Sequence, residues 1–385
     1  MGYKMDVTNM SDSGPFLFEN WKAYNNNEPI ELTVEYPLYT DARVIGEIKF
    51  DYGPYKLLNT VPSKDQPGLL KPSIIFRADI HLRNELPQMY RTDTSNYHGG
   101  YFSDEIAALI SLCLGIRIKA ADESRRFYPD GDPLGCPQAF RFRNEPAMSI
   151  GSGQLILPNA VGQHRLDDIF PIKILPKLSG EEAISVIRAA RLYQDALWLS
   201  ESEPALSWLM FVSALEVGAN MWSNNEDDPV SKLAASKPEL YETLKSYNIN
   251  GLTELVANQI VPTLGVTNKF IKFAMNYLPN PPDSRPEKYA QINWSKSSMR
   301  SALGKIYAYR SAALHGGIPF PRPMSYGPMI IDGHMAEKPT GLASSSQGGV
   351  WLAEETPMLL HMFEYITRKI IINWIVSLGG GAAVR

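Results

Sequence analysis

Hydrophobic and polar residues alternate in several short runs between about residues 30 and 175. The clearest runs are Glu31–Tyr36, Arg43–Phe50 and Ile74–His81, each bounded by glycine, proline, asparagine or aspartate. A period of two residues is typical of strands that bury one face, and the bounding residues favour turns. Two weaker runs, Gln154–Leu157 and Phe170–Leu175, add two further candidate strands.

One helix is predicted inside this strand-rich stretch. Ser103 is a good N-cap residue, Ile106–Leu114 supplies an apolar face, and Gly115 is placed to end the helix. We therefore expect residues 1–178 to form an α+β domain, whose role the pattern does not reveal.

The periodicity changes to that of helices near residue 179. Ser179 and Glu182 have the spacing of a capping box, which opens a predicted helix running to about Leu199. A second helix is expected from about Ser202 to Trp222, with Pro204 in its first turn. Further helices are predicted at 230–247, 252–260, 265–277 and 354–378. One more helix is predicted after the proline-rich segment 279–286, and it ends at His315. Residues 179–385 are thus expected to form an all-α helical bundle, with a long loop at 316–350.

An arginine interrupts the apolar stripe of the helix that ends at residue 315. With Met299 set to zero and about 100° per residue, Leu303, Ile306 and Leu314 fall near 40°, −20° and 60° and form the stripe. Arg310 falls at about 20°, in the middle of this stripe. A cation in that position should meet a carboxylate, a subunit interface or a bound anion, because an unpaired buried charge is costly.

His315 lies five residues further on, followed directly by two glycines. The helix is expected to end there, so the wheel does not fix the direction of the imidazole. An arginine and a histidine that both reach one phosphate can cleave RNA without a metal. The arginine would hold the phosphate in a charge-assisted fork, and the histidine would move the proton of the 2′-hydroxyl.

A purely structural interpretation fits the same residues. Arg310 would then form a buried ion pair with a carboxylate such as Glu216, which ends the apolar run Trp208–Glu216. His315 would only cap the C-terminus of its helix, where a positive charge is favoured.

Three segments together resemble the Apea-like branch of the HEPN superfamily. They are Arg191–Leu199, Trp208–Glu216 and Tyr307–Gly316, in this order and on predicted helices. The resemblance covers roughly residues 180–378. It implies a helical bundle that pairs as a homodimer, in which Arg-x4–6-His motifs from two protomers face one cleft and form a metal-independent endoribonuclease site.

The resemblance also implies roles for individual residues. Arg310 would bind phosphate, His315 would act as general acid and base, and Glu216 would orient the arginine. Ser311 stands where active members often carry asparagine, aspartate or histidine, and this departure argues against catalysis.

Three more side chains are candidates for RNA contact. Lys296 and Arg300 are four residues apart on the helix of Arg310, so they share a face and are expected at the rim of the cleft. Tyr307 is placed to stack on a base, although helix packing explains it equally well. In the first half, Arg125–Arg126 and Arg141–Arg143 form the best basic clusters; a solvated strand face is the simpler explanation of these.

Composition narrows the functional classes. The chain has 385 residues, a formal net charge of −4 and a pI near 5.9, which argues against a protein that coats nucleic acid. Its 2 cysteines form no zinc pattern, and no metal or small-molecule cofactor is expected. The first residues lack the apolar segment of a signal peptide, and no apolar run is long enough to span a membrane. A cytoplasmic protein is therefore expected.

Two functional hypotheses follow. The first is a metal-independent ribonuclease of the HEPN type that acts on RNA as a homodimer, in stress response or antiviral defence. The second is a non-catalytic HEPN module for interaction or scaffolding, joined to an N-terminal domain that senses a signal or binds a ligand. A different enzyme built on residues 1–178 has no motif behind it.

Overall fold

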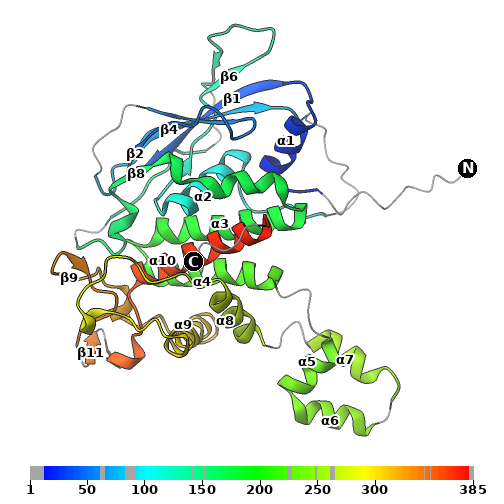
Figure 1. Ribbon diagram of the computed structural model, residues 1–385, viewed down its shortest axis with the longest axis vertical. Coiled ribbons are helices and arrows are strands. Elements are labelled where there is room, and N and C mark those ends of the chain that lie inside the picture. The colour runs from blue at the N-terminus through cyan, green and yellow to red at the C-terminus, as the bar shows by residue number, and fades with distance from the viewer. Residues whose placement is uncertain are drawn as a thin grey trace, which may run out of the picture.

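The chain forms an N-terminal region of helices with an antiparallel sheet, followed by a mostly helical region (Figure 1). The computed structural model describes residues 13–60, 66–82, 92–139, 143–150, 153–222, 228–247, 249–260, 265–341, 343–346 and 348–380. No helix in these ranges is long and apolar enough to cross a membrane.

The N-terminal sheet has the strand order β3-β4-β1-β6-β7, with β5 also paired to β1. Its strands are β1 (Leu32–Thr40), β3 (Tyr55–Asn59), β4 (Lys71–Ile80), β5 (Lys119–Ala120), β6 (Arg125–Phe127) and β7 (Cys136–Pro137). The long pair β1–β4 is antiparallel, with Leu32 opposite Ile80 and a register shift at Leu38/Tyr39. A separate short pair joins β2 (Arg43–Ile45) in parallel to β8 (Gln163–Arg165).

Two of the five predicted strands are confirmed, in β1 and β4, and a third is shorter than expected. The run Arg43–Phe50 is a strand only to Ile45, because Gly46 adopts a positive φ of 91°. After it, Ile48 makes one isolated bridge to Leu57.

The two weaker strand predictions are wrong. Residues 154–157 form no strand, and the N–H groups of Ile156 and Leu157 donate to the Glu201 carboxylate instead of to a neighbouring strand. The run Phe170–Leu175 is the start of a 3-10 helix, η4 (Phe170–Lys177), which contains Pro171 and Pro176. These prolines lack the N–H that a sheet ladder requires.

Helices lie beneath the sheet in successive layers (Figure 1). The first is α2 (Phe102–Leu114), followed by α3 (Gly180–Leu199) with α10 (Leu360–Leu378), and then by α4 (Pro204–Trp222). Helices α8 (Val266–Asn276) and α9 (Lys296–Gly316) form the lowest layer. Helix α1 (Phe16–Asn25), which the alternation pattern did not predict, packs beside the sheet.

The helix-capping predictions are largely confirmed. Ser179 and Glu182 form the predicted capping box of α3, and α4 begins at Pro204. Gly115 ends α2 with a left-handed φ of 71°. The prediction of Ser103 as the N-cap is wrong, because α2 begins two residues earlier than expected: its N-cap is Tyr101, whose N–H donates to the Asp104 carboxylate.

The later segments differ from the prediction in three places. The last helix was expected from residue 354, but α10 begins at Leu360, after the 3-10 turn η9 (Ala353–Glu355). The helix expected at 230–247 is divided into α5 (Pro229–Ser236) and α6 (Pro238–Ser246), because Pro238 cannot continue the preceding helix. Together with α7 (Leu252–Ile260), these helices project from the rest of the molecule (Figure 1).

The region 316–350 is not one long loop. It contains the 3-10 turn η8 (Arg322–Ser325) and the short hairpin β9–β10 (Ile330–Ile331 with His334–Met335). A second hairpin, β11–β12, pairs Ala343–Ser346 with Gly349–Leu352. The C-terminal region is therefore mostly, but not entirely, helical.

One hydrophobic core runs through both regions. Helix α2 is buried along almost its whole length, between the sheet and α3. Phe76 of the sheet, Ile110 of α2, Tyr193 of α3 and Trp374 of α10 all belong to the same cluster of buried residues. The change from strands to helices near residue 179 is therefore not a break in packing. By contrast, α5–α7 enclose a separate small core around Leu233 and Ala257.

Candidate functional site

Arg310 lies on α9 and is paired with Glu216 of α4, as one of the sequence interpretations proposed. Its Nη2 donates to Glu216 Oε2 at 2.6 Å, and the Tyr307 hydroxyl donates to Oε1 of the same carboxylate at 2.9 Å. The side chain of Arg310 is 20% exposed and that of Glu216 is 12% exposed. The guanidinium also lies 5.6 Å from the centre of the Tyr307 ring. One carboxylate thus holds both side chains.

The apolar stripe explains why Arg310 needs this partner. Met299, Leu303 and Ile306 are buried on the core side of α9, as the helical wheel predicted. The prediction for Leu314 is wrong: it is 52% exposed, so the buried stripe ends before it and Arg310 lies at its last covered turn. Arg310 Nε is buried and has no hydrogen-bond partner among the described residues. A charge in this place requires Glu216.

Burial and the Glu216 carboxylate raise the pKa of Tyr307 to about 12. The phenol therefore remains protonated near neutral pH and can only serve Glu216 as a donor. This hydrogen bond fixes the carboxylate in the position that receives Arg310.

A shallow groove of about 460 Å³ follows the solvent side of α9. We call it the α9 groove. It is lined by Thr267, Gly304, Tyr307, Ala308, Ser311, Ala312, His315 and Gly316. His315 is exposed in the last turn of α9, which ends at Gly317 with a left-handed φ of 66°.

The structure brings only some of the predicted site residues together. Tyr307, Ser311 and His315 line the α9 groove, whereas Arg310 is not among its lining residues and faces α4. Tyr307 lines the groove and also contacts the Arg310 guanidinium through its ring.

Lys296 and Arg300 lie in the first turns of α9, at the opposite end from His315. Both are exposed, and neither lines the α9 groove. A rise of about 1.5 Å per residue separates Arg300 from His315 by about 22 Å along the helix. The sequence predicted both residues at the rim of the cleft; both lie on α9, but neither is among the residues that line the α9 groove.

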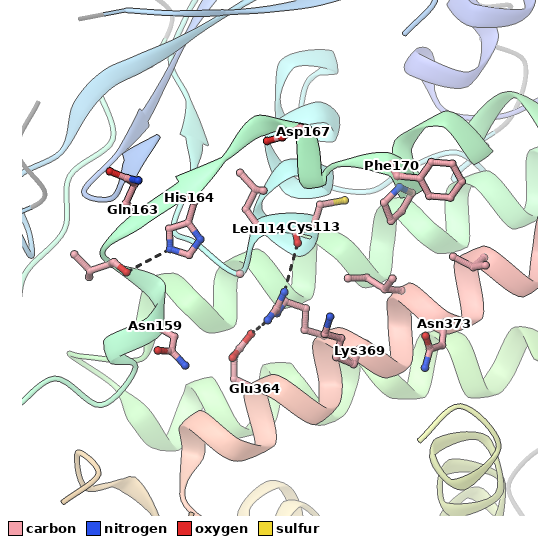
Figure 2. A pocket seen from close by; sticks show the side chains of 16 residues that line it. Cys113, Leu114, Asn159, Gln163, His164, Asp167, Phe170, Glu364, Lys369 and Asn373 are labelled. Atoms are coloured by element: carbon pink, nitrogen blue, oxygen red, sulfur yellow. Dashed lines mark hydrogen bonds and ion pairs between the residues drawn. The ribbon is translucent and has the colours of Figure 1, made fainter. Parts of the chain in front are cut away.

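Sequence reasoning missed a larger cleft between the N-terminal region and α10, which has a volume of about 810 Å³ (Figure 2). Its residues come from the end of α2, from the segment 159–171 and from α10. No local motif marks it, because the three segments are far apart in the sequence.

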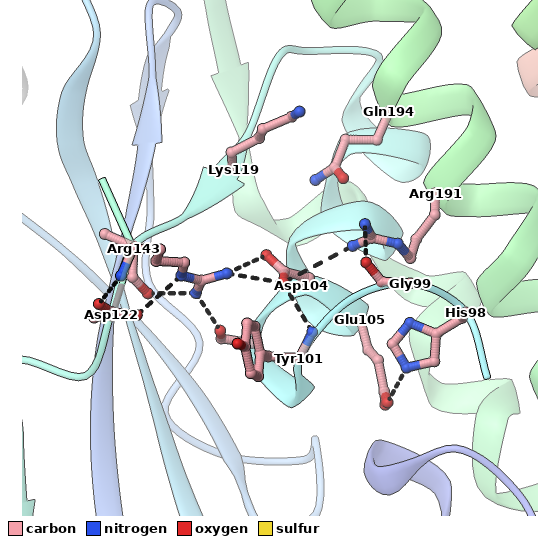
Figure 3. Close-up of polar contacts among 12 residues, drawn as sticks. His98, Gly99, Tyr101, Asp104, Glu105, Lys119, Asp122, Arg143, Arg191 and Gln194 are labelled. Atoms are coloured by element: carbon pink, nitrogen blue, oxygen red, sulfur yellow. Dashed lines mark hydrogen bonds and ion pairs between the residues drawn. The ribbon is translucent and has the colours of Figure 1, made fainter. Parts of the chain in front are cut away.

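A polar cluster at the start of α2 was also missed (Figure 3). Arg143 Nη1 donates to Asp104 at 2.8 Å, and its Nε donates to Asp122 at 3.0 Å. Arg191, from the first segment of the resemblance, donates to the carbonyl of Gly99 at 3.3 Å. These arginines join α2, α3 and the preceding loops.

The sequence pointed to two basic clusters in the N-terminal half, Arg125–Arg126 and Arg141–Arg143. Their described members form ion pairs or hydrogen bonds within the protein. Arg126 pairs with Glu123 at 2.8 Å, and Arg143 is bound as above. Arg141 lies outside the described residues. The described arginines of these two clusters therefore serve mainly to hold the fold together.

Within the described ranges, no group of three or more His, Cys, Asp or Glu side chains is arranged to hold a metal ion. Burial raises the pKa of the Cys113 thiol to about 12, so this cysteine is protonated and a poor nucleophile near neutral pH.

Comparisons with protein-family models, with curated proteins and with solved structures found no match for this chain.

Proposed function

We propose that the helical region is an RNA-cleaving module of the HEPN type that works without a metal and is completed by a second copy of the chain. The observation that carries the proposal is the double hydrogen bond to Glu216. This carboxylate receives both Tyr307 and Arg310, and so fixes a cation beside the helix end that carries His315.

The chemistry follows from these two side chains. His315 takes the proton of an RNA 2′-hydroxyl, and O2′ attacks the adjacent phosphorus as the bond from phosphorus to O5′ breaks. The products are a 2′,3′-cyclic phosphate and a 5′-hydroxyl, and the imidazolium returns its proton to the leaving O5′. Arg310 stabilises the charge that develops on the non-bridging oxygens, because a guanidinium fork matches their geometry.

The need for a second copy comes from the directions of the two side chains. In one chain, His315 lines the α9 groove while Arg310 faces Glu216. Two α9 helices related by a two-fold axis would bring the histidine of each copy toward the arginine of the other. Several residues that line the groove are small, among them Gly304, Ala308 and Ala312, and small side chains permit the close approach of a second helix.

The test is RNA cleavage by the purified protein in the presence of EDTA, with Arg310→Ala and His315→Ala variants. Each variant alone should lose about 100-fold in rate or more. A mixture of the two should recover about a quarter of the wild-type rate, because half of the dimers are mixed and each of these retains one intact site.

His334→Ala is the matched control and should cleave at the wild-type rate, because His334 lies outside the groove and contacts Ser284. If both single variants cleave as fast as the wild type, the activity does not belong to this site. If the variants are inactive and their mixture stays inactive although mixed dimers form, the site is not shared between copies.

A second candidate function, a non-catalytic interaction module, is favoured by one specific observation. Glu216 already neutralises Arg310, and His315 has no hydrogen-bond partner among the described residues. In that case the wild type would not cleave RNA, and Arg310→Ala would lower stability instead of activity. Thermal unfolding of the same variants separates the two candidates.

A further inference from the structure

The lowest layer of the molecule, formed by α8 and α9, has charged side chains of one sign only (Figure 1). Neither helix contains an aspartate or a glutamate, whereas α8 carries two lysines and α9 carries two lysines, two arginines and His315. The whole chain has 41 acidic and 37 basic residues, so this layer departs from the overall balance. A local excess of positive charge attracts a polyanion even when the net charge of the protein is negative.

Only part of this positive charge is used within the protein. Lys305 pairs with Glu355 at 2.8 Å, and Arg310 pairs with Glu216 at 2.6 Å. The other lysines and arginine of the two helices form no ion pair in the part of the chain that the structure describes; they are Lys269, Lys272, Lys296 and Arg300. We call these four residues the α8–α9 cations. Lys269 is half-buried and the other three are exposed, so their charges are open to a partner in solution.

The two cations at the start of α9 share a face with the α9 groove. With Arg300 set to zero and about 100° per residue, Lys296 falls near −40°. Ser311 and His315, which line the groove, fall near 20° and 60°. At about 1.5 Å per residue, Lys296 lies about 28 Å from His315 along the helix axis. One face of α9 therefore leads from the groove to the basic first turns.

Helix α8 crosses α9 near the middle of this face. A Cβ at Gly304 would lie 3.8 Å from Ile271 Cδ1, and the ring centres of Phe270 and Tyr307 are 5.0 Å apart. The two lysines of α8 directly precede and follow the pair 270–271 in the sequence, so they lie within one turn of the crossing. The α8–α9 cations therefore extend from the crossing to the start of α9.

The other side chains of this layer favour a sugar–phosphate backbone as the partner. Ser297 and Ser301 are exposed beside the cations of α9, and hydroxyl and basic side chains are those that contact phosphates and sugars. Among the large exposed hydrophobic residues of the described chain, α8 and α9 contribute only Leu314, in the last turns of α9. A membrane-binding face needs apolar side chains that enter the lipid, and a protein interface needs apolar or aromatic anchors. The basic end of this layer has neither.

We infer that a single RNA strand lies along α9, with its phosphates on the α8–α9 cations and its cut phosphate at His315. The place of the cut rests on the proposed function, whereas the binding does not. A reader of duplex RNA spans about 16 base pairs, which is longer than this face. With about 3.4 Å per nucleotide of a stacked strand, the 28 Å from His315 to Lys296 correspond to about eight nucleotides.

The experiment measures binding separately from cleavage. Fluorescence anisotropy follows the full-length protein with labelled oligouridylates in which every 2′-oxygen is methylated, so that O2′ cannot attack. At low salt we expect saturable binding with a Kd below about 100 μM. Between oligomers of about 4, 8 and 12 nucleotides, the affinity should rise up to about eight and change little beyond that length.

Two double variants test the place of binding, Lys296→Gln/Arg300→Gln and Lys269→Gln/Lys272→Gln. Each should weaken binding about 10-fold and reduce the slope of log K against log salt by about 1.4, because each phosphate contact on a single strand contributes about 0.7. The control Lys237→Gln/Lys288→Gln removes two exposed lysines from other elements and should bind as the wild type does. If unmodified RNA is cleaved, the test variants should raise KM and leave kcat unchanged.

Three results would overturn the inference. The first is no saturable binding of the longest oligomer, and the second is wild-type affinity and salt slope in both test variants. The third is equally tight binding of a polyglutamate peptide or of phosphatidylserine vesicles, which would assign this face to an acidic protein or a membrane. Binding as expected without cleavage of unmodified RNA removes the proposed function and leaves this inference. Cleavage with wild-type KM in both test variants does the reverse.

Discussion

At the scale of single residues, buried charges join segments that are distant in the sequence. Arg117 is fully buried and donates to both oxygens of Asp41 at 2.8 and 3.1 Å, and to Glu201 at 3.4 Å. Glu201 in turn accepts two backbone N–H groups of the segment 156–157. One guanidinium therefore fixes the end of β1, the turn after α3 and the segment before η2 (Pro158–Ala160).

The first prediction concerns this network. Arg117→Met leaves the Asp41 and Glu201 carboxylates buried without their cation, which should cost about 3–5 kcal/mol of the free energy of unfolding. Urea denaturation measures it. Arg165→Met is the matched control, because the pair of Arg165 with Asp167 is exposed and its loss should leave the urea midpoint unchanged. Equal midpoints for both variants would contradict the role assigned to Arg117.

His361 gives a second prediction, on pH. It is 4% exposed in the first turn of α10, and burial lowers its pKa from 6.5 to about 4. Between these values the unfolded chain binds more protons than the folded one, so stability is full above pH 6.5 and falls as the pH approaches 4. The loss amounts to about 3 kcal/mol.

Urea midpoints measured from pH 7 to pH 4 test this second prediction. His361→Leu should show a smaller fall in stability over that range than the wild type does. Parallel curves for the two proteins would mean that His361 is not the group responsible.

At the scale of elements, two glycines inside helices have opposite surroundings. A Cβ at Gly218 of α4 would lie 2.5 Å from the Phe273 ring of α8, so this glycine permits the close approach of the two helices. A Cβ at Gly304 of α9 would meet only Ile271 Cδ1, at 3.8 Å. Helix propensity is therefore overridden by packing at one position and not at the other.

A third prediction compares these two glycines. Gly304→Ala should stabilise the protein by about 0.5–1 kcal/mol through helix propensity. Gly218→Ala should destabilise it by about 1–3 kcal/mol, because Phe273 must move within a packed core. Thermal unfolding of the two variants side by side is the measurement, and a gain in stability at Gly218 would contradict the packing argument.

The elements also show how far the sequence could predict the structure. Alternation identified β1 and β4, and capping chemistry identified α3 and α4, because these signals are local. The apolar runs at 154–157 and 170–175 were misassigned, since their backbone donors go to Glu201 or are removed by prolines. Helix α1 and strand β3 were not predicted from the pattern.

The candidate site was predictable only in part. The helical wheel predicted Arg310 on the buried face, and the apolar run Trp208–Glu216 offered Glu216 as its partner. The distance between Arg310 and His315 could not be predicted, because the helix ends at the histidine. The cleft beside α10 could not be predicted either, since three distant segments form it.

At the scale of the whole molecule, packing divides the chain differently from secondary structure. The sheet, α2, α3, α4 and α10 share one buried cluster, although strands and helices are separated along the sequence. Helices α5–α7 lie outside that cluster, and their own buried core consists of Leu233 and Ala257. A small core contributes little stability.

The fourth prediction is therefore that α5–α7 open locally, well before the rest unfolds. Amide hydrogen exchange followed by mass spectrometry should show that peptides from 229–260 exchange about 100-fold faster than peptides from α3 and α4. Peptides from α10 serve as an internal control and should be as protected as those from α3. Uniform protection across the chain would contradict this division.

The shared core has a consequence for synthesis on the ribosome. The sheet and α2 emerge early, yet part of the surface that covers α2 belongs to α10, about 250 residues later. Until residues 360–378 leave the exit tunnel, Cys113 and the apolar residues around it face water. Nascent chains stalled before that point should therefore bind chaperones and be cut by protease within α2, whereas released chains should not.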